Sequence, residues 1–234
     1  MTVARERHHR RRLDGAGKAE VPAPPAPPRE LRADAQRNLA RILEAAREVF
    51  AEDGIDAPIS VIAERAGVGV GTIFRRFPHK DELVAALLEQ RGRQLVDAVD
   101  LALASEDSGK AFRGFIELTV STQIKDRGLC DAIGTELLAR EDLRARFDVV
   151  HVGLAALLER AQAAGAVRSD ATAEDVVLVF HGVAHAGLML EDVAPGAWRR
   201  YLALALDGLR PEGATPLPRR PISRRQFEAA RCGG

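Results

Sequence analysis

The chain has 234 residues, of which 46% are hydrophobic and 4% aromatic, and its formal net charge at pH 7 is +0. This length can bury a substantial core in one or two small domains, and the abundance of Ala and Leu favours helices over strands. The only cysteines, Cys130 and Cys232, lack a CxxC spacing, which argues against a disulfide framework or a thiolate metal site and fits a reducing cytoplasm. With neither a signal-peptide pattern nor a run of about 18 apolar residues, the chain is expected to be soluble and cytoplasmic.

Residues 1–30 are expected to form a disordered tail. They combine a basic cluster at 5–12 with a proline-rich run at 22–28, which cannot form a helix or a sheet ladder. This segment is either a solvated linker or a basic arm that adds phosphate or minor-groove contacts.

Three helical segments follow, in a first domain expected over 31–80. Apolar residues at steps of three and four predict a helix that begins near Asp34 as its cap and stops at Gly54. A second helix is predicted from Pro58 to Gly67 and a third over 70–77, where the following proline stops it.

The second and third helices have the features of a helix-turn-helix. Ala63 is small where two helix backbones must approach, and Gly67 can take the left-handed conformation that ends a helix and turns sharply. Ile73 is apolar where the third helix must press back on the second. This spacing predicts a third helix that is presented outward.

The same segment, from about Gln36 through Leu83, resembles the DNA-binding region of the TetR family of bacterial transcriptional regulators. The family pattern is matched by Ile62, Ala63, Ala66, Gly67, Val68, Gly71, Thr72, Ile73, Phe74, Phe77, Lys80 and Leu83. Two positions depart from it. Phe74 replaces a usual tyrosine and so lacks a hydroxyl for phosphate, and His79 replaces a usual Ser or Thr cap.

The resemblance implies a set of DNA contacts, position by position. The residues nearest base edges would be Val70, Gly71 and Arg75, and those against phosphates would be Thr72, Phe74, Arg76 and Lys80. Arg75 is suited to direct readout because its planar fork can pair with guanine O6 and N7. The zero net charge does not exclude DNA, since affinity depends on local basic clusters. The alternative is that Arg75 and Arg76 only solvate a helix face.

A larger second domain is expected over 81–210. A helix that begins near Lys80 should run to a break at 105–109 and connect the two domains. Further helices are predicted at about 110–125, 129–139, 141–164, 172–190 and 195–209, with Thr172 and Asp175 as a capping signal and Pro195 opening the last. The fold class is therefore all-α, with about nine helices, followed by a second disordered basic and proline-rich tail at 211–234.

The second domain is expected to bind a small-molecule effector, as the resemblance implies. The residues that would line the site are Phe112, Phe115, Ile116, Thr119, Gln123, Leu137, Phe147, His151, Leu154, His181 and Met189. Most of these positions are better explained as plain core than as ligand contacts, because any helix must bury a stripe.

Other chemistry finds little support in the sequence. His181 and His185 have a chelating spacing and His151 could be a third ligand, but these histidines are better read as pocket or interface residues. No Gly-x-Ser-x-Gly elbow, GxGxxG or P-loop is present, so we expect no enzyme, no cofactor and no metal.

We therefore expect a ligand-responsive repressor that binds a palindromic operator as a homodimer. The apolar faces of 172–190 and 195–209 should form the dimer, with small Gly182, Ala184, Ala186 and Gly187 allowing close packing. Apolar residues expected on these faces are Val176, Val177, Val179, Phe180, Val183, Trp198, Tyr201, Leu202, Ala205, Leu206 and Leu209. The alternatives are a ligand-independent or activating DNA-binding protein and a helical ligand carrier or enzyme.

Overall fold

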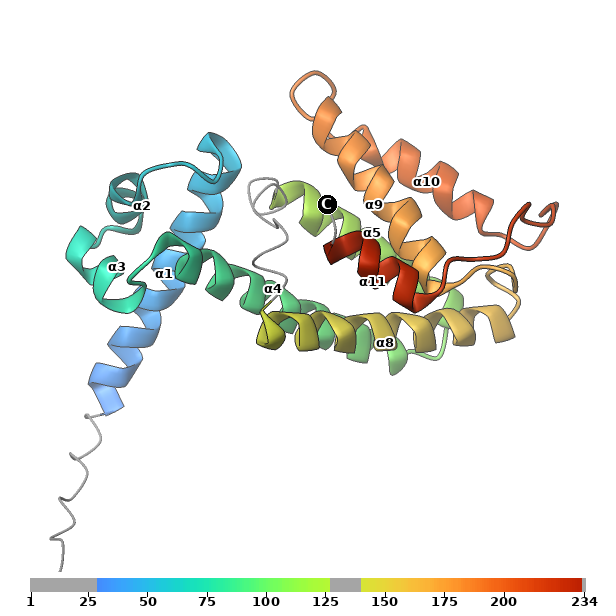
Figure 1. The fold of residues 1–234 in the computed structure, drawn as a ribbon, viewed down its shortest axis with the longest axis horizontal. Helices are drawn as coiled ribbons and strands as arrows, with labels where there is room; N and C mark the ends of the chain where they lie inside the picture. The colour runs from blue at the N-terminus through green and yellow to red at the C-terminus, as the bar shows by residue number, and fades with distance from the viewer. Residues whose placement is uncertain (1–28, 127–139, 233–234) are drawn as a thin grey trace, which may run out of the picture.

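The computed structural model describes residues 29–126 and 140–232, and these residues form nine α-helices and no strand (Figure 1). The helices are α1 (Arg29–Asp53), α2 (Ile59–Ala66), α3 (Val70–Arg76), α4 (Lys80–Leu103), α5 (Ser108–Lys125), α8 (Glu141–Ala163), α9 (Ala173–Leu190), α10 (Trp198–Gly208) and α11 (Arg224–Cys232). Helices α1 to α3 lie at one end of the molecule, α9 to α11 lie at the other, and α4 joins the two ends. The predicted helix at 129–139 lies outside the described residues.

The first core holds the three N-terminal helices and the first half of α4. Its members with no exposed side chain include Phe50 of α1, Ile62 of α2 and Ile73 of α3. The same cluster continues along α4 as far as Leu88 and takes in Leu143 of α8. The first core therefore includes side chains from the first half of α4, beyond residue 80.

The turn between α2 and α3 has the predicted geometry. Gly67 has φ of 63°, and its backbone N–H donates to the carbonyl oxygens of Ala63 and Glu64. A left-handed residue at this place ends α2 and directs the chain into α3. Ala63 is 1% exposed, so the small residue lies where the helices meet.

The second core lies between α4, α5, α8, α9 and α10. Large side chains from several helices meet there, among them Phe112 of α5, Leu157 of α8 and Trp198 of α10. Gly187 of α9 permits a close approach of the helices, since an added Cβ would lie 2.7 Å from Trp198 Cβ and 2.8 Å from Ile124 Cδ1. Gly187 and Ala184 are therefore buried within one protomer rather than at a dimer interface. The same is true of four of the apolar residues expected on the dimer face, namely Val176, Phe180, Trp198 and Leu202.

Several helix boundaries differ from the sequence prediction for identifiable reasons. Helix α1 begins at Arg29 rather than near Asp34, because residues 29–33 are mostly good helix formers and Asp34 pairs with Arg37 instead of capping. Helix α10 begins at Trp198 rather than at Pro195, because Gly196 has φ of 75° and interrupts the helix there. The predicted Thr172–Asp175 capping box is present at the start of α9.

The segment 211–234 is not uniformly irregular, in contrast to the predicted disordered tail. Residues 224–232 form α11. Ser223 and Gln226 cap it reciprocally: Ser223 N–H donates to Gln226 Oε1 at 2.9 Å, and Gln226 N–H donates to Ser223 Oγ at 3.3 Å. The Ser-x-x-Gln spacing of a capping box was the sequence signal for this helix.

Candidate nucleic-acid interface

Helix α3 is anchored by its inner face. Ile73 is 0% exposed, and Phe77, which follows the last residue of the helix, is 6% exposed. Both side chains belong to the first core. The remaining side of a seven-residue helix must then face away from the protein.

The outer face of α3 carries the residues expected to contact DNA. Val70 is 38% exposed and Phe74 is 48% exposed, although both are large and apolar. Gly71, Arg75 and Arg76 are exposed as well, and Thr72 is half-buried. Exposed apolar side chains beside exposed arginines make this surface suited to contact with another molecule.

The two arginines of α3 carry unneutralised charge. Arg75 Nε donates to the carbonyl oxygen of Gly71 at 3.2 Å, and the Arg76 guanidinium lies 5.6 Å from the centroid of the Phe77 ring. None of the ion pairs among the described residues involves Arg75 or Arg76. Arg65 of α2, by contrast, is held by Glu52 of α1 at 2.7 Å and lowers the pKa of that carboxyl through its hydrogen bond.

Lys80 stands at the first position of α4, beside the end of α3. Its Nζ lies 5.8 Å from the centroid of the buried Phe50 ring, so a contact with phosphate requires the side chain to extend outward. His79 precedes it as the N-cap and makes no side-chain capping bond, as its substitution for Ser or Thr predicts. The free N–H groups of this helix start therefore remain available to an anion.

Arg41, which was not predicted from the sequence, holds the turn between α2 and α3. From α1, its Nε and Nη2 donate to the carbonyl oxygen of Ala66 at 3.1 and 2.5 Å, and Nη2 also donates to that of Gly67 at 3.0 Å. These bonds satisfy the carbonyls at the end of α2 and fix the turn that orients α3. No local sequence pattern links residues 25 positions apart.

Comparison with known proteins agrees with this geometry. Residues 42–87 match the family model for bacterial regulatory proteins of the tetR family, and residues 107–211 match that of the transcriptional regulator SbtR-like C-terminal domain. A TetR transcription regulatory protein from Mycobacterium vanbaalenii is 36% identical, with 77% of this chain and 99% of that one covered at a TM-score of 0.59. The chain belongs to the TetR family of transcriptional regulators.

Two further relatives show how far the likeness extends. The regulator SCO0520 from Streptomyces coelicolor is 32% identical over 74% of this chain and 98% of that one, with a TM-score of 0.59. The fatty acid metabolism regulator protein of Bacillus subtilis is 31% identical over 71 residues, which are 30% of this chain. Those residues span only 37% of that protein's length, so its likeness carries no information on a ligand of this chain.

The residues expected to line an effector site are divided between core and surface. Phe112, Phe115, Ile116 and Leu154 lie in the second core, and Thr119 donates to the carbonyl oxygen of Phe115 at 2.8 Å. Phe147 and His151 are half-buried on α8. The structure thus favours plain core for four of these positions.

The remaining expected effector residues lie elsewhere. Gln123 Nε2 and His181 Nδ1 form a hydrogen bond of 2.8 Å that joins α5 to α9. Met189 is 74% exposed and lies on the surface rather than in a cavity, and Leu137 lies outside the described residues. A depression of about 520 Å³ beside Arg140 and Ala145 is lined by none of the predicted residues.

The three histidines considered as metal ligands do not converge. His151 Nε2 lies 3.2 Å from Glu174 Oε1, whereas His181 is bonded to Gln123 and His185 is exposed. Over residues 29–126 and 140–232, no group of three His, Cys, Asp or Glu side chains is placed to hold a metal ion.

An ion-pair cluster connects the two ends of the molecule. Asp126, directly after α5, lies 3.5 Å from Arg91 of α4 and 3.7 Å from Arg47 of α1. Burial raises the pKa of Asp126, although the charges of Arg91 and Arg47 act in the opposite direction. These ion pairs join the end of α5 to α4 and to α1.

Proposed function

We propose that this TetR regulator is a ligand-responsive repressor that binds a palindromic operator as a homodimer. The observation that carries the proposal is the division of α3 between a buried Ile73 and an exposed face with Phe74, Arg75 and Arg76. A helix of this kind fits the major groove, about 12 Å wide, with its early residues towards the base edges. Val70, Gly71 and Arg75 would read bases, whereas Thr72, Phe74, Arg76 and Lys80 would position the backbone.

Homodimerisation is supported by exposed apolar side chains on two adjacent helices. They are Leu178, Val179 and Met189 on α9 and Tyr201 and Leu204 on α10, and α9 and α10 pack side by side (Figure 1). A Cβ added at Gly182 of α9 would meet no atom within 4 Å, so this face is open to a second copy. A two-fold dimer would place two α3 helices at the spacing of successive major grooves, about 34 to 36 Å.

Ligand response is supported by the connection between the two cores. Helix α8 contributes Leu143 to the first core and Leu157 to the second, and Asp126 joins α5 to α1. A ligand that binds one arrangement of the second domain more tightly would thereby shift the separation of the two α3 helices. The residues named from the sequence on α5, α8 and α9 remain the first positions to test for effector contact.

We place the protein in the cytoplasm, where the operator is found. Helix α9 is long and apolar enough by composition to cross a membrane, yet its Val176, Phe180 and Ala184 are buried in the second core. Its exposed apolar residues are those assigned to the dimer. Burial and dimerisation together account for the composition of this helix.

Selection of bound fragments from genomic DNA, followed by titration of the chosen duplex, tests the proposed function. Saturable binding to one palindrome with two protomers per site is expected. Equal affinity for all duplexes would favour the ligand-independent DNA-binding protein, and the absence of duplex binding would favour the ligand carrier.

A further inference from the structure

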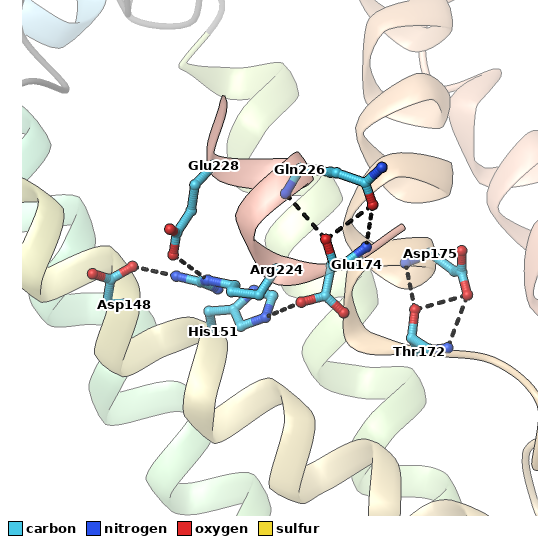
Figure 2. A network of polar contacts seen from close by, with 9 residues as sticks. Asp148, His151, Thr172, Glu174, Asp175, Arg224, Gln226 and Glu228 are labelled. Atoms are coloured by element: carbon cyan, nitrogen blue, oxygen red, sulfur yellow. Dashed lines mark hydrogen bonds and ion pairs between the residues drawn. The ribbon is translucent and has the colours of Figure 1, made fainter. Parts of the chain in front are cut away.

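Helix α11 places a positive charge and an aromatic ring side by side on α8. Phe227 is 3% exposed, and its ring centroid lies 5.9 Å from that of His151. Arg224, one turn earlier, forms ion pairs with Asp148 of α8 and with Glu228 of its own helix (Figure 2). The rest of the described part of α11 is exposed or half-buried.

The surface beneath α11 carries two carboxylates around an aromatic centre. Asp148 and Glu174 flank His151, and Glu174 Oε1 lies 3.2 Å from His151 Nε2 (Figure 2). Burial lowers the pKa of His151, and the charge of Arg224 lowers it further, so the imidazole is predominantly neutral near pH 7. Two carboxylates beside a neutral ring attract a cation that carries an apolar group.

The attachment of α11 rests on few contacts. Phe227 is its only buried side chain among residues 224–230, and the connecting residues 210–221 are exposed. Arg224 Nη1 is buried without a hydrogen-bond partner, which leaves the cation incompletely satisfied. Ordering a nine-residue helix opposes these contacts, and ion pairs near the surface contribute little.

We propose that the surface formed by Asp148, His151 and Glu174 is a binding site for an amphipathic organic cation, and that α11 is its intramolecular occupant. Arg224 stands in for the positive group of the ligand and Phe227 for its aromatic or apolar group. This inference rests on the proposed function only in taking the site as an effector site, because binding itself requires no DNA. The ligand would act on α8, whose Leu143 is 1% exposed in the first core.

The test uses the full chain, without DNA, and rhodamine 6G as the cationic aromatic probe. Phe227→Ala removes the apolar contact of α11 and should increase the affinity for rhodamine 6G about fivefold or more, since a self-occupied site weakens apparent binding. Arg225→Ala is the matched control, because Arg225 is exposed on the same helix and forms none of the ion pairs among the described residues. It should leave the affinity unchanged. If Phe227→Ala fails to fold, Arg224→Ala is the second variant, and it should increase the affinity for rhodamine 6G in the same way.

Two further measurements identify the occupant and the charge preference. In the wild type, saturation with rhodamine 6G should increase hydrogen exchange over residues 223–232, independently of protein concentration. In the Phe227→Ala background, Asp148→Asn should weaken the binding of rhodamine 6G and leave the binding of the anionic dye 8-anilinonaphthalene-1-sulfonate unchanged.

Three results would overturn the proposal. Equal rhodamine 6G affinity in wild type and Phe227→Ala would show that α11 does not occupy the site. If Phe227→Ala increased the affinity for the anionic dye by the same factor, the site would have no preference for cations. Protection of residues 223–232 that rises with protein concentration would assign α11 to a second copy of the chain. All three are independent of duplex binding, so they are distinguishable from failure of the DNA-binding proposal.

Discussion

Arg41 and Ala66 join two helices that are separated by 25 positions in sequence: two nitrogens of the Arg41 guanidinium donate to the Ala66 carbonyl oxygen, at 3.1 and 2.5 Å. The acceptor is the last residue of α2, and the next residue, Gly67, makes the left-handed turn into α3. The turn that leads into α3 is therefore held by a side chain that is distant from it in sequence.

Arg41→Ala should loosen this turn. Hydrogen bonds from a charged donor contribute about 1.5 to 3 kcal/mol, and the partial exposure of Arg41 favours the lower end of that range. We expect a lower urea midpoint and weaker operator binding, measured by chemical denaturation and duplex titration. Arg41→Lys is the control. It keeps the charge without the planar fork, so it should recover little of the stability and operator affinity lost in Arg41→Ala. Full recovery in Arg41→Lys would show that charge alone is required.

Arg75 and Lys80 should differ in the kind of DNA contact that they lose. If the Arg75 fork reads a guanine, as proposed, Arg75→Ala should cost about 1 to 3 kcal/mol at the cognate operator and relax preference at one base pair. Lys80→Ala should weaken binding to cognate and scrambled duplexes alike, and it should reduce the slope of log affinity against log salt concentration by about one unit. Titrations at several salt concentrations measure both effects. Unaltered affinity in both variants would mean that α3 does not face DNA.

Val179→Glu should dissociate the dimer. Val179 is 45% exposed on α9, in the face assigned to the second copy, and a carboxylate buried there would lack a partner. Sedimentation at micromolar concentration measures the outcome. Val152→Glu makes the same change at a 68% exposed position on α8 and should remain dimeric. If only the Val152→Glu variant dissociates, the dimer interface lies on α8 rather than on α9.

Gly187→Ala and Gly114→Ala should change stability in opposite directions. An added methyl at Gly187 would lie 2.7 Å from Trp198 Cβ, whereas one at Gly114 would meet no atom within 4 Å. Overpacking at Gly187 should cost about 1 to 3 kcal/mol, and the better helix propensity of Ala should stabilise α5 by about 0.5 to 1 kcal/mol. Chemical denaturation of the two variants distinguishes these outcomes. A neutral Gly187→Ala would show that α9 and α10 separate easily.

The free energy of unfolding should fall as pH is lowered through the unfolded pKa of histidine, about 6.5. Burial and Arg224 lower the pKa of His151 in the folded state, so between that pKa and 6.5 the unfolded chain binds more protons. Glu174 and Asp148 act in the opposite direction, and the other charged residues of α11 are Arg225, Glu228 and Arg231.

Comparison with His151→Gln isolates this contribution. Urea denaturation at about pH 8 and about pH 5.5 should show that the wild type loses more stability than the variant, because glutamine does not titrate in this range. A difference between the two proteins that does not change with pH would contradict a lowered pKa at His151.

The sequence by itself determined the helix-turn-helix, because its constraints are local. Gly67, Ile73 and Pro78 act on their own neighbourhood through backbone conformation, helix face and helix termination, so α2 and α3 could be placed to within a residue at each end. The resemblance to TetR regulators has the same origin: it rests on residues that a short turn requires. Thr172 and Asp175 likewise predicted the start of α9 because a capping box is complete within one turn.

Tertiary structure decided which apolar residues serve the core and which remain exposed. Phe180 and Val179 are adjacent and both apolar, yet Phe180 is 4% exposed and Val179 is 45% exposed, because only one of them faces α5 and α10. The bond from Arg41 to Ala66, the place of Leu143 in the first core and the docking of Phe227 against His151 depend on segments that are distant in sequence. Helical periodicity shows that a residue belongs to an apolar face, but only the packing of whole helices determines what that face contacts.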